Sequence, residues 1–326
     1  MSNLPVFESN MNEAAVDLFD EMLEMDAILN GIMDETELGP TIFDLGIKSK
    51  GGYLAGEYTT QVCLGGLAEV SLDMKTYDQN LTLPTVTVIT DFPAIATMGS
   101  QFAGWSINKD NYKAMASGPA RIFAKKPKHI YEKLPIKDDH DETVVVLETN
   151  RYPPESIMKY IAEKCKIELD CLCIIITPTT SQAGVTQIAG RSVETAIHKL
   201  MDLGMDVTTI KSAIGTCPIA PLSTNDDLMM GRTNDMLIYG SEIYLQVNYK
   251  NEKELLELTT KAISEKSKSY GSLFYDIVKE AQGDFYKIDP ALFAPAKLIV
   301  NNIYTGNIIS FGEINLKLLL KSCSFK

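Results

Sequence analysis

Short runs of β-branched residues alternate with amphipathic stretches along most of this chain of 326 residues. Branched side chains pack well on a pleated surface, and apolar residues that recur every three to four positions form one face of a helix. The predicted strands are residues 85–90, 143–147, 172–177, 205–214, 236–247 and 297–301. The predicted helices are residues 11–33, 154–164, 193–203, 252–264 and 269–281. This alternation predicts a mixed α/β (α+β) fold.

Glycines and polar stretches suggest how the chain is divided. Glycine pairs within residues 46–66 predict a hairpin or a ligand-facing sheet edge there. Hydrophobic residues make up 45% of the chain, enough for one large core or two ordinary domains. The most linker-like segment, residues 125–142, mixes charges of both signs with two prolines. It predicts an N-terminal α/β domain over residues 1–140 and a C-terminal α/β domain over residues 141–326, and it leaves open whether each domain is continuous.

The charge balance and the missing motifs exclude several classes of protein. Lys and Arg number 30 against 43 Asp and Glu, and the net charge of −13 repels phosphate backbones, so we expect no nucleic-acid partner. No apolar run approaches twenty residues and no secretory leader begins the chain, so we expect a cytoplasmic protein without membrane contact. The cysteines and histidines lack metal-ligand spacing and no nucleotide-binding glycine motif occurs, so we expect no metal and no prosthetic group.

Residues 178–200 place small residues ahead of two opposite charges. Arg191 and Glu194 lie three residues apart on a predicted helix, so their side chains share one face. Spacing alone favours an ordinary ion pair at the start of a surface helix. The loop before it favours a ligand-facing position, because its small side chains let a bound molecule approach the backbone.

Several further blocks follow one another in a fixed order from about residue 50 to residue 240. They are Gly65-Gly66-Leu67-Ala68, Ala103-Gly104-Trp105, Ser117-Gly118-Pro119-Ala120-Arg121, Pro153-Pro154-Glu155 and Thr233-Asn234-Asp235. Together with residues 178–200, these blocks resemble methenyltetrahydromethanopterin cyclohydrolase, an archaeal enzyme family of one-carbon metabolism and methanogenesis. The resemblance implies two domains that face each other across a large pocket, and assembly as a homotrimer.

The resemblance also implies a reaction and its principal residues. The reaction is the reversible hydrolysis of the methenyl bridge of N5,N10-methenyl-tetrahydromethanopterin to the N5-formyl derivative, and this pterin is the substrate that carries the one-carbon group. Glu194 corresponds to the general base that acts on water, and Arg191 to its charge partner. The methenyl carbon belongs to an amidinium cation and is already electrophilic, so the chemistry requires no metal.

Substrate contacts are expected at the small-residue loop. Ser181, Ala183, Gly184 and Gln187 are candidates for lining the pterin, the glutamine because its amide matches donor and acceptor edges of the ring. A polar loop that satisfies its own backbone explains Gln187 equally well. Trp105, the single tryptophan, either stacks on a ring system or fills the core.

Two more blocks carry polar candidates. Ser117, Gly118 and Arg121 have the composition of a tight anion-facing turn, and the guanidinium suits the phosphate and carboxylates at the far end of methanopterin. Asn234 and Asp235 precede a predicted strand, where they either contact the pterin or form an Asx-type turn. The sequence does not indicate which methanopterin variant is used or in which direction the reaction runs.

Two rival functions are consistent with the residues. Cys217 and His198 would form the nucleophile and base of a cysteine hydrolase if the fold brought them together. A non-catalytic pterin-binding protein would use the same pocket without turnover.

Overall fold

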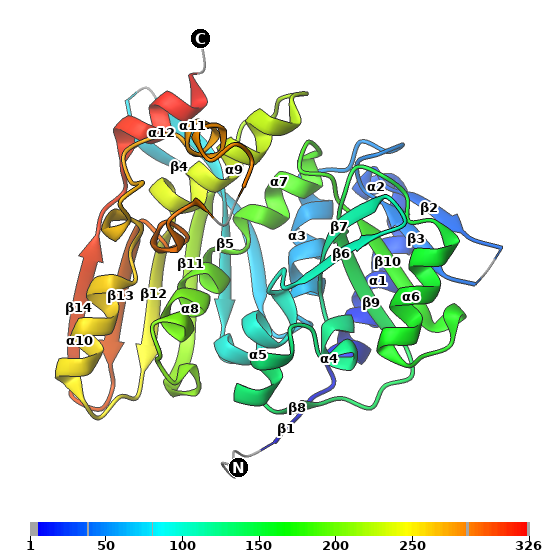
Figure 1. Ribbon diagram of the computed structural model, residues 1–326, viewed down its shortest axis with the longest axis horizontal. Coiled ribbons are helices and arrows are strands. Elements are labelled where there is room, and N and C mark those ends of the chain that lie inside the picture. Colours follow the sequence, from blue (N-terminus) through cyan, green and yellow to red (C-terminus); the bar gives the residue numbers. More distant parts are fainter. Residues whose placement is uncertain (1–5, 38, 80, 285–286, 325–326) are drawn as a thin grey trace. The chain divides into compact units, whose positions relative to one another are not determined.

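The computed structural model describes residues 6–37, 39–79, 81–284 and 287–324, and Figure 1 shows their mixed α/β architecture, which confirms the predicted fold class. The chain forms two compact units, and each is discontinuous in sequence. Unit 1 comprises residues 1–69 and 95–187, and unit 2 comprises residues 70–94 and 188–326. Residue 140, where composition predicted a boundary, lies inside unit 1. The polar segment around it contains a helix and a strand of that unit, and its charges are solvated surface rather than a linker.

Unit 1 is built on a sheet in the order β2-β3-β10-β9-β7-β6. Its strands are β2 (Ile32–Glu35), β3 (Thr41–Asp44), β10 (Leu172–Ile176), β9 (Thr143–Glu148), β7 (Tyr112–Ser117) and β6 (Trp105–Lys109). The central strands β3, β10 and β9 are parallel, and the outer pairs are antiparallel. The two central predicted strands were found because strands buried on both faces appear as continuous apolar runs. The carboxyl ends of the three parallel strands therefore meet at one edge.

Helices cover both faces of this sheet (Figure 1). One apolar cluster joins the sheet to α1 (Met11–Glu24) and α3 (Tyr53–Cys63), and the other joins it to α4 (Ala120–Ala124) and α6 (Glu155–Cys165). The smaller elements of unit 1 are α2 (Asp26–Leu29), the π-helix η1 (Ile95–Gln101), α5 (Lys128–Lys133), η2 (Leu169–Cys171) and the parallel pair β1 (Phe7–Glu8) and β8 (Ile136–Lys137).

The hairpin predicted within residues 46–66 is wrong, because most of that segment is helix α3. Its glycine at position 56 serves helix packing instead of a turn. A Cβ atom there would lie 2.4 Å from Cβ of Thr186 and 2.8 Å from the carbonyl oxygen of Ala183, both in α7 (Gln182–Ala189). Only glycine permits so close an approach of the two helices.

Unit 2 is built on a sheet in the order β14-β13-β12-β11-β5-β4. Its strands are β4 (Glu69–Asp78), β5 (Leu81–Thr90), β11 (Ile210–Pro218), β12 (Glu242–Val247), β13 (Lys297–Asn302) and β14 (Asn307–Gly312). The pair β12–β13 is parallel, whereas β11 is antiparallel to both of its neighbours. Residues 70–94 belong to this unit because β5 pairs with β11, far away in the sequence.

Helices α8 (Ser192–Asp202) and α9 (Asp226–Gly240) pack on β11. The other helical elements of unit 2 are η3 (Val207–Thr209), α10 (Glu252–Lys261), η4 (Ser264–Lys266), α11 (Phe274–Glu280), η6 (Pro290–Leu292) and α12 (Leu316–Cys323). Among the described residues, no helix combines the length and the apolar content that crossing a membrane requires.

The strand predicted over residues 236–247 is wrong in its first half, which forms the last turn of α9. Helix α9 lies between β11 on one side and α11 and α12 on the other, so Met236, Leu237, Ile238 and Tyr239 are all buried. A helix buried all round shows no helical period, and its apolar run resembles a buried strand.

Asp235 ties three helices of unit 2 together. Its Oδ1 accepts a hydrogen bond of 2.8 Å from the backbone N–H of Phe274 at the start of α11, and its Oδ2 accepts one of 2.8 Å from the hydroxyl of Ser322 in α12. Burial raises the pKa of this carboxyl to about 7, although both hydrogen bonds act to lower it. Asp235 therefore holds its proton in the native state over a pH range in which an exposed aspartate has lost it.

This predicts a pH-dependent stability that Asp235→Asn should remove. An unfolded aspartate releases its proton near its ordinary pKa of 3.8, whereas native Asp235 releases it near 7. The contribution of this residue to the free energy of unfolding is therefore fully present below pH 3.8 and is lost as the pH rises to about 7. Relative to the variant, the wild type should lose up to about 1.4 kcal/mol of unfolding free energy per pH unit in this window. Urea denaturation from pH 5 to 8 measures the difference, and parallel profiles for the two proteins would contradict it.

Candidate functional site

The segment after β10 turns sharply and then forms two successive helices. Residues 182–189, predicted as part of a loop, form α7, and this part of the prediction is wrong. The hydroxyl of Ser181 accepts a hydrogen bond of 2.9 Å from the amide of Gly184 and donates one of 3.0 Å to the carbonyl of Pro178. A Cβ atom on Gly184 would lie 2.0 Å from that same carbonyl oxygen, so the small residues are required by the turn itself. Ala183 and Gln187 are buried in α7.

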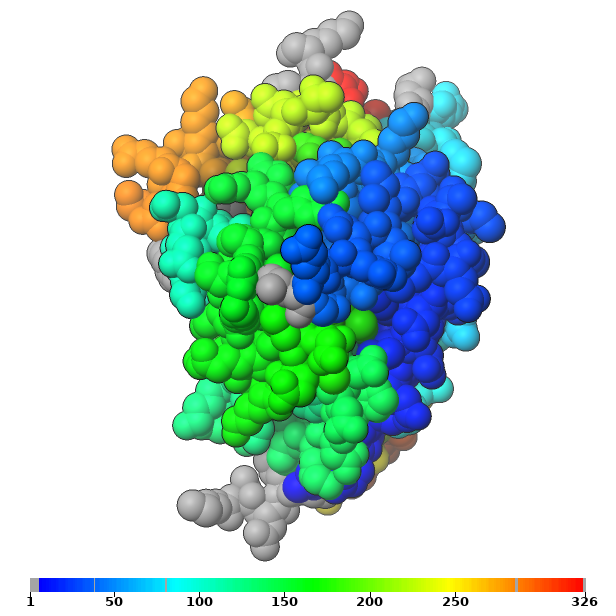
Figure 2. Space-filling model, turned by 90° about the vertical axis from the view of Figure 1, so that its right-hand side faces the viewer, coloured from blue at the N-terminus to red at the C-terminus, as the bar shows by residue number. Residues whose placement is uncertain are grey.

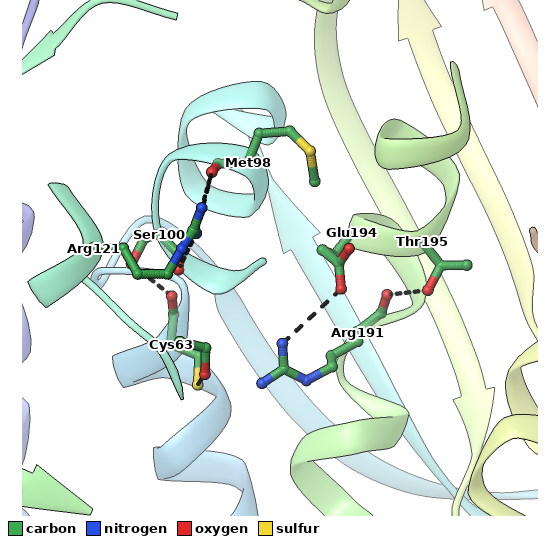
Figure 3. A network of polar contacts seen from close by, with 8 residues as sticks. Cys63, Met98, Ser100, Arg121, Arg191, Glu194 and Thr195 are labelled. Carbon is green, nitrogen blue, oxygen red and sulfur yellow. Dashed lines mark hydrogen bonds and ion pairs between the residues drawn. The ribbon is translucent and has the colours of Figure 1, made fainter. Parts of the chain in front are cut away.

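Arg191 and Glu194 form a buried ion pair at the start of α8. Figure 3 shows the two side chains pointing toward each other, with 4.0 Å between Nη1 of Arg191 and Oε2 of Glu194. Only 8% of the arginine side chain and 9% of the glutamate side chain are exposed. Arg191 precedes the helix and Glu194 lies in its first turn, where the positive end of the helix dipole also favours an ionised carboxylate. Such burial argues against the alternative of an ion pair on a solvated surface helix.

Close packing of α8 on β11 fixes the position of this pair within unit 2. Val193, Ala196, Ile197 and Leu200 form an apolar stripe on this helix and are fully buried. A Cβ atom on Gly215 of β11 would lie 2.6 Å from Oγ of Ser192 and 2.7 Å from Cγ2 of Val193. Gly215 was not predicted as a packing position, although an isolated glycine within a strand pattern often marks such a close approach.

Arg121 is a structural residue of unit 1. Its guanidinium is fully buried, and Nη1 donates hydrogen bonds to the backbone carbonyls of Ser100 at 2.9 Å and Met98 at 3.2 Å (Figure 3). Nε donates one of 2.7 Å to the carbonyl of Lys126. The hydrogen bonds to Met98 and Ser100 tie η1 to α4. The guanidinium also lies over the rings of Phe102 and Tyr131. This geometry gives no support to the predicted role of Arg121 in binding an anionic tail.

The remaining residues of that block and Trp105 also lie in the interior of unit 1. Gly118 has a φ of +92°, which glycine adopts without strain. Ser117 is buried, with its Oγ 3.5 Å from Sγ of Cys63. Trp105 is buried in the sheet of unit 1, and its ring centroid lies 6.2 Å from that of Tyr160. All three residues are therefore buried within unit 1.

Asn234 and Asp235 lie inside α9, so the turn predicted at the start of a strand is wrong. The strand begins only at Glu242. The amide of Asn234 donates to the carbonyl of Met230 one helical turn earlier, at 2.9 Å, and Asp235 bonds to α11 and α12.

Cys217 has the environment of a core thiol. It is fully buried, its Sγ donates a hydrogen bond of 3.4 Å to the carbonyl of Pro218, and burial raises its pKa far above the ordinary value. The thiolate that a cysteine nucleophile needs is therefore strongly disfavoured. His198 lies 3.7 Å from Asp202 on its own helix. Within the described ranges, no three Asp, Glu, His or Cys side chains are placed to hold a metal ion.

A carboxylate that the sequence analysis missed lies at the end of β3. Asp44 is fully buried and accepts hydrogen bonds from several backbone amides of the residues that follow it. An aspartate two residues before a glycine, at the end of a strand, is a known turn signal and could have identified it.

Comparison with known proteins gives a consistent result. The family model described as "Cyclohydrolase (MCH)" matches residues 10–323. A protein of Methanoculleus marisnigri named methenyltetrahydromethanopterin cyclohydrolase is 42% identical, over 97% of this chain and 99% of its own length. Proteins of the same name from Methanoregula boonei and Methanococcus maripaludis are 43% and 39% identical, over 96% and 97% of this chain and 98% of their own lengths. The chain therefore belongs to the methenyltetrahydromethanopterin cyclohydrolase family, which confirms the resemblance seen in its ordered sequence blocks.

Proposed function

We propose that this protein is an enzyme that catalyses the reversible hydrolysis of N5,N10-methenyl-tetrahydromethanopterin to N5-formyl-tetrahydromethanopterin. Family membership over nearly the whole chain supports the substrate class. The single structural observation that carries the mechanism is the buried ion pair between Arg191 and Glu194. Burial of a charged pair costs desolvation free energy unless other interactions compensate each partner. Buried charged pairs of this kind are common in active sites.

Glu194 is the proposed general base. Its carboxylate takes a proton from water as the water oxygen bonds to the methenyl carbon, which gives a neutral tetrahedral adduct. The protonated Glu194 then returns this proton to N10 as the bond between carbon and N10 breaks. The hydroxyl proton of the adduct leaves to solvent, and the carbon remains on N5 as a formyl group. One cation and one water thus give a neutral product and one proton, and the reverse sequence closes the ring.

Arg191 is the proposed charge partner of this base. The guanidinium and the amides of the first turn of α8 favour the ionised carboxylate, while burial favours the neutral acid. A carboxyl group balanced between these two influences can both accept and return a proton. The cationic substrate also gains from a carboxylate near its reacting carbon.

The small residues before Arg191 in the chain are the proposed pterin contacts. Ser181, Ala183 and Gly184 keep this assignment because they form the start of α7, which the hydroxyl of Ser181 caps, and Gln187 keeps it because it is buried in the same helix. For Trp105, Ser117, Gly118, Arg121, Asn234 and Asp235, a substrate contact rests on the family resemblance alone. Their hydrogen bonds and packing favour an indirect role, in which they hold the framework of their unit.

Further properties are proposed, the trimer and the archaeal origin from the family resemblance and the others from the composition and motifs of the chain. They are a homotrimeric assembly, an archaeal cytoplasmic location, the absence of a prosthetic group, and no partner other than the pterin substrate, neither nucleic acid nor membrane. The net charge of −13 is consistent with the absence of a nucleic-acid partner.

The proposed activity predicts that the purified protein accelerates the loss of the near-ultraviolet absorbance of the methenyl cation. Addition of water to the carbon interrupts the delocalised amidinium, so absorbance follows hydrolysis directly. A protein that binds the pterin without accelerating its decay would instead be a non-catalytic binding protein, and the proposal would fail.

Glu194→Gln should lower kcat by about 10²- to 10⁴-fold, because the amide cannot accept the proton of the attacking water. The matched control is Glu254→Gln. Glu254 also follows the N-cap residue of its helix by three positions, but it is exposed on α10. The control should keep wild-type turnover in the same absorbance assay. A folded Glu194→Gln protein with near-normal kcat would show that another group is the base.

Thiol alkylation separates this mechanism from that of a cysteine hydrolase. Cys217 is fully buried and its thiol pKa is raised, so iodoacetamide at neutral pH should leave most of the activity intact. Cys217→Ala should likewise retain kcat within a few-fold. Loss of turnover in a folded Cys217→Ala protein would favour the rival mechanism.

A further inference from the structure

The carboxylate of Asp44 organises the turn that follows β3. Its Oδ1 accepts hydrogen bonds from the amides of Gly46 at 2.9 Å and Ile47 at 2.8 Å, and its Oδ2 accepts from those of Lys48 at 2.6 Å and Ser49 at 3.3 Å. Burial alone would raise the pKa of Asp44, but these bonds outweigh it and the pKa is lowered. An ionised carboxylate therefore acts as the centre around which residues 46–49 are wrapped.

Two further contacts make this turn rigid. The hydroxyl of Tyr152, in the segment after β9, donates a hydrogen bond of 2.9 Å to Oδ2 of Asp44. The ammonium of Lys48 lies 4.0 Å from the centroid of the Tyr152 ring, a cation–π contact that holds the lysine stem along the ring. The turn after β3 is thus bound to the segment after β9, at the edge where the parallel strands end.

The same turn presses on the start of α7. A Cβ atom on Gly46 would lie 2.2 Å from Cβ and 2.6 Å from Oγ of Ser181, so the backbone of the turn is in direct contact with this serine. Ser181 in turn accepts the amide hydrogen bond of Gly184. A continuous chain of contacts therefore runs from the carboxylate through Gly46 and Ser181 to Gly184.

The place of these contacts in the sheet points to ligand binding. In sheets with parallel strands, ligands bind beyond the carboxyl ends of the strands, where the connecting loops meet. The turn after β3 and the segments after β9 and β10 all belong to this edge of unit 1. Thr179, after β10, donates a hydrogen bond of 2.9 Å to Glu148 at the end of β9, which links the third segment to the others.

We propose that Asp44 is a positioning residue for the pterin substrate, because its carboxylate holds Gly46 against Ser181 and thereby fixes the start of α7. This inference rests on the proposed function, in which Ser181 and Gly184 contact the substrate. Asp44 itself need not touch the pterin. Since a carboxylate only accepts hydrogen bonds, an amide at this position would set its NH2 group against other donors.

Asp44→Asn should therefore raise KM for the methenyl substrate by about tenfold, while kcat stays within about threefold. A contact that is equally strong in the bound substrate and in the transition state affects KM alone. A shift of Ser181 and Gly184 weakens binding of these two states equally, so we expect KM to change and kcat to be nearly unaffected. Hydrogen exchange of the amides of residues 46–49 should become faster in the variant, which shows that the turn has loosened. Steady-state kinetics and peptide-resolved exchange are measured on the full-length protein.

Asp138→Asn is the matched control within the same unit. Asp138 also accepts hydrogen bonds from backbone amides and a hydroxyl, at 3.1 Å from Asn12, 3.3 Å from His140 and 2.7 Å from Ser9. Its partners lie at the start of α1 and near the amino end of β9. KM and kcat should stay at the wild-type values in this control, even if its stability falls.

Two other variants change the same turn and test the positioning role if Asp44→Asn does not fold. Gly46→Ala keeps the carboxylate but forces Ser181 to move, and it should raise KM in the same way. Tyr152→Phe removes a single hydrogen bond to Asp44 and should give a smaller rise of KM. These variants act on the turn from either side of the proposed chain of contacts.

The outcomes separate the two proposals. If the wild type hydrolyses the pterin and the folded variants keep its KM, the positioning role of Asp44 is wrong while the proposed function stands. If the wild type shows no turnover, the proposed function is wrong, and the role given to Asp44 fails with it. A fall of kcat at unchanged KM would also overturn the positioning role.

Discussion

The account depends on one electrostatic arrangement, the ion pair of Arg191 and Glu194 held out of water at the start of α8. A glutamate in this position is favoured as a carboxylate by the guanidinium 4.0 Å away and by the helix dipole, and it is disfavoured by burial. The opposed influences matter more than either one alone, because the proposed general base must take up a proton and then release it. The close packing of α8 against Gly215 of β11 holds the start of the helix, and with it the ion pair, in place.

Small residues around the start of α7 have a structural use and a proposed one in substrate binding. Ser181 and Gly184 look like residues that admit a ligand, yet the turn after β10 needs both for its own geometry, since the serine caps the helix and the glycine clears a carbonyl oxygen. The two uses are compatible. The small residues of this helix start are buried and hydrogen-bonded to one another, and Asp44 adds a buried charge that stabilises this arrangement from the neighbouring turn.

Much of the fold follows from local pattern, and the errors have physical causes. The buried strands β9 and β10 were predicted because parallel strands covered on both faces appear as unbroken apolar runs. The same rule failed at residues 236–240, where a helix covered on both sides gives the same apolar run. The glycines of residues 46–66 suggested turns, but the use of Gly56 in helix packing depends on α7, which is far away in the sequence. The two units interleave through a strand pairing that no local composition reveals.

The candidate site was partly predictable for related reasons. A separation of three residues at the start of a helix predicts that Arg191 and Glu194 lie together, and the structure brings them to 4.0 Å. The burial of Arg121 and its backbone partners depends on η1, a segment distant in the sequence, so its structural role could not be foreseen. Asp44 was missed because its importance lies in amides that converge only once the turn has formed.

The central claim is that Arg191 and Glu194 act as one unit, and a double-mutant cycle on kcat tests it most directly. The cycle compares Arg191→Met, Glu194→Gln and the double variant with the wild type in the absorbance assay. We expect the double variant to be no slower than Glu194→Gln alone, because the arginine acts through the carboxylate that this change has already disabled. Losses that multiply in the double variant would show that the two side chains act independently, and would contradict the account.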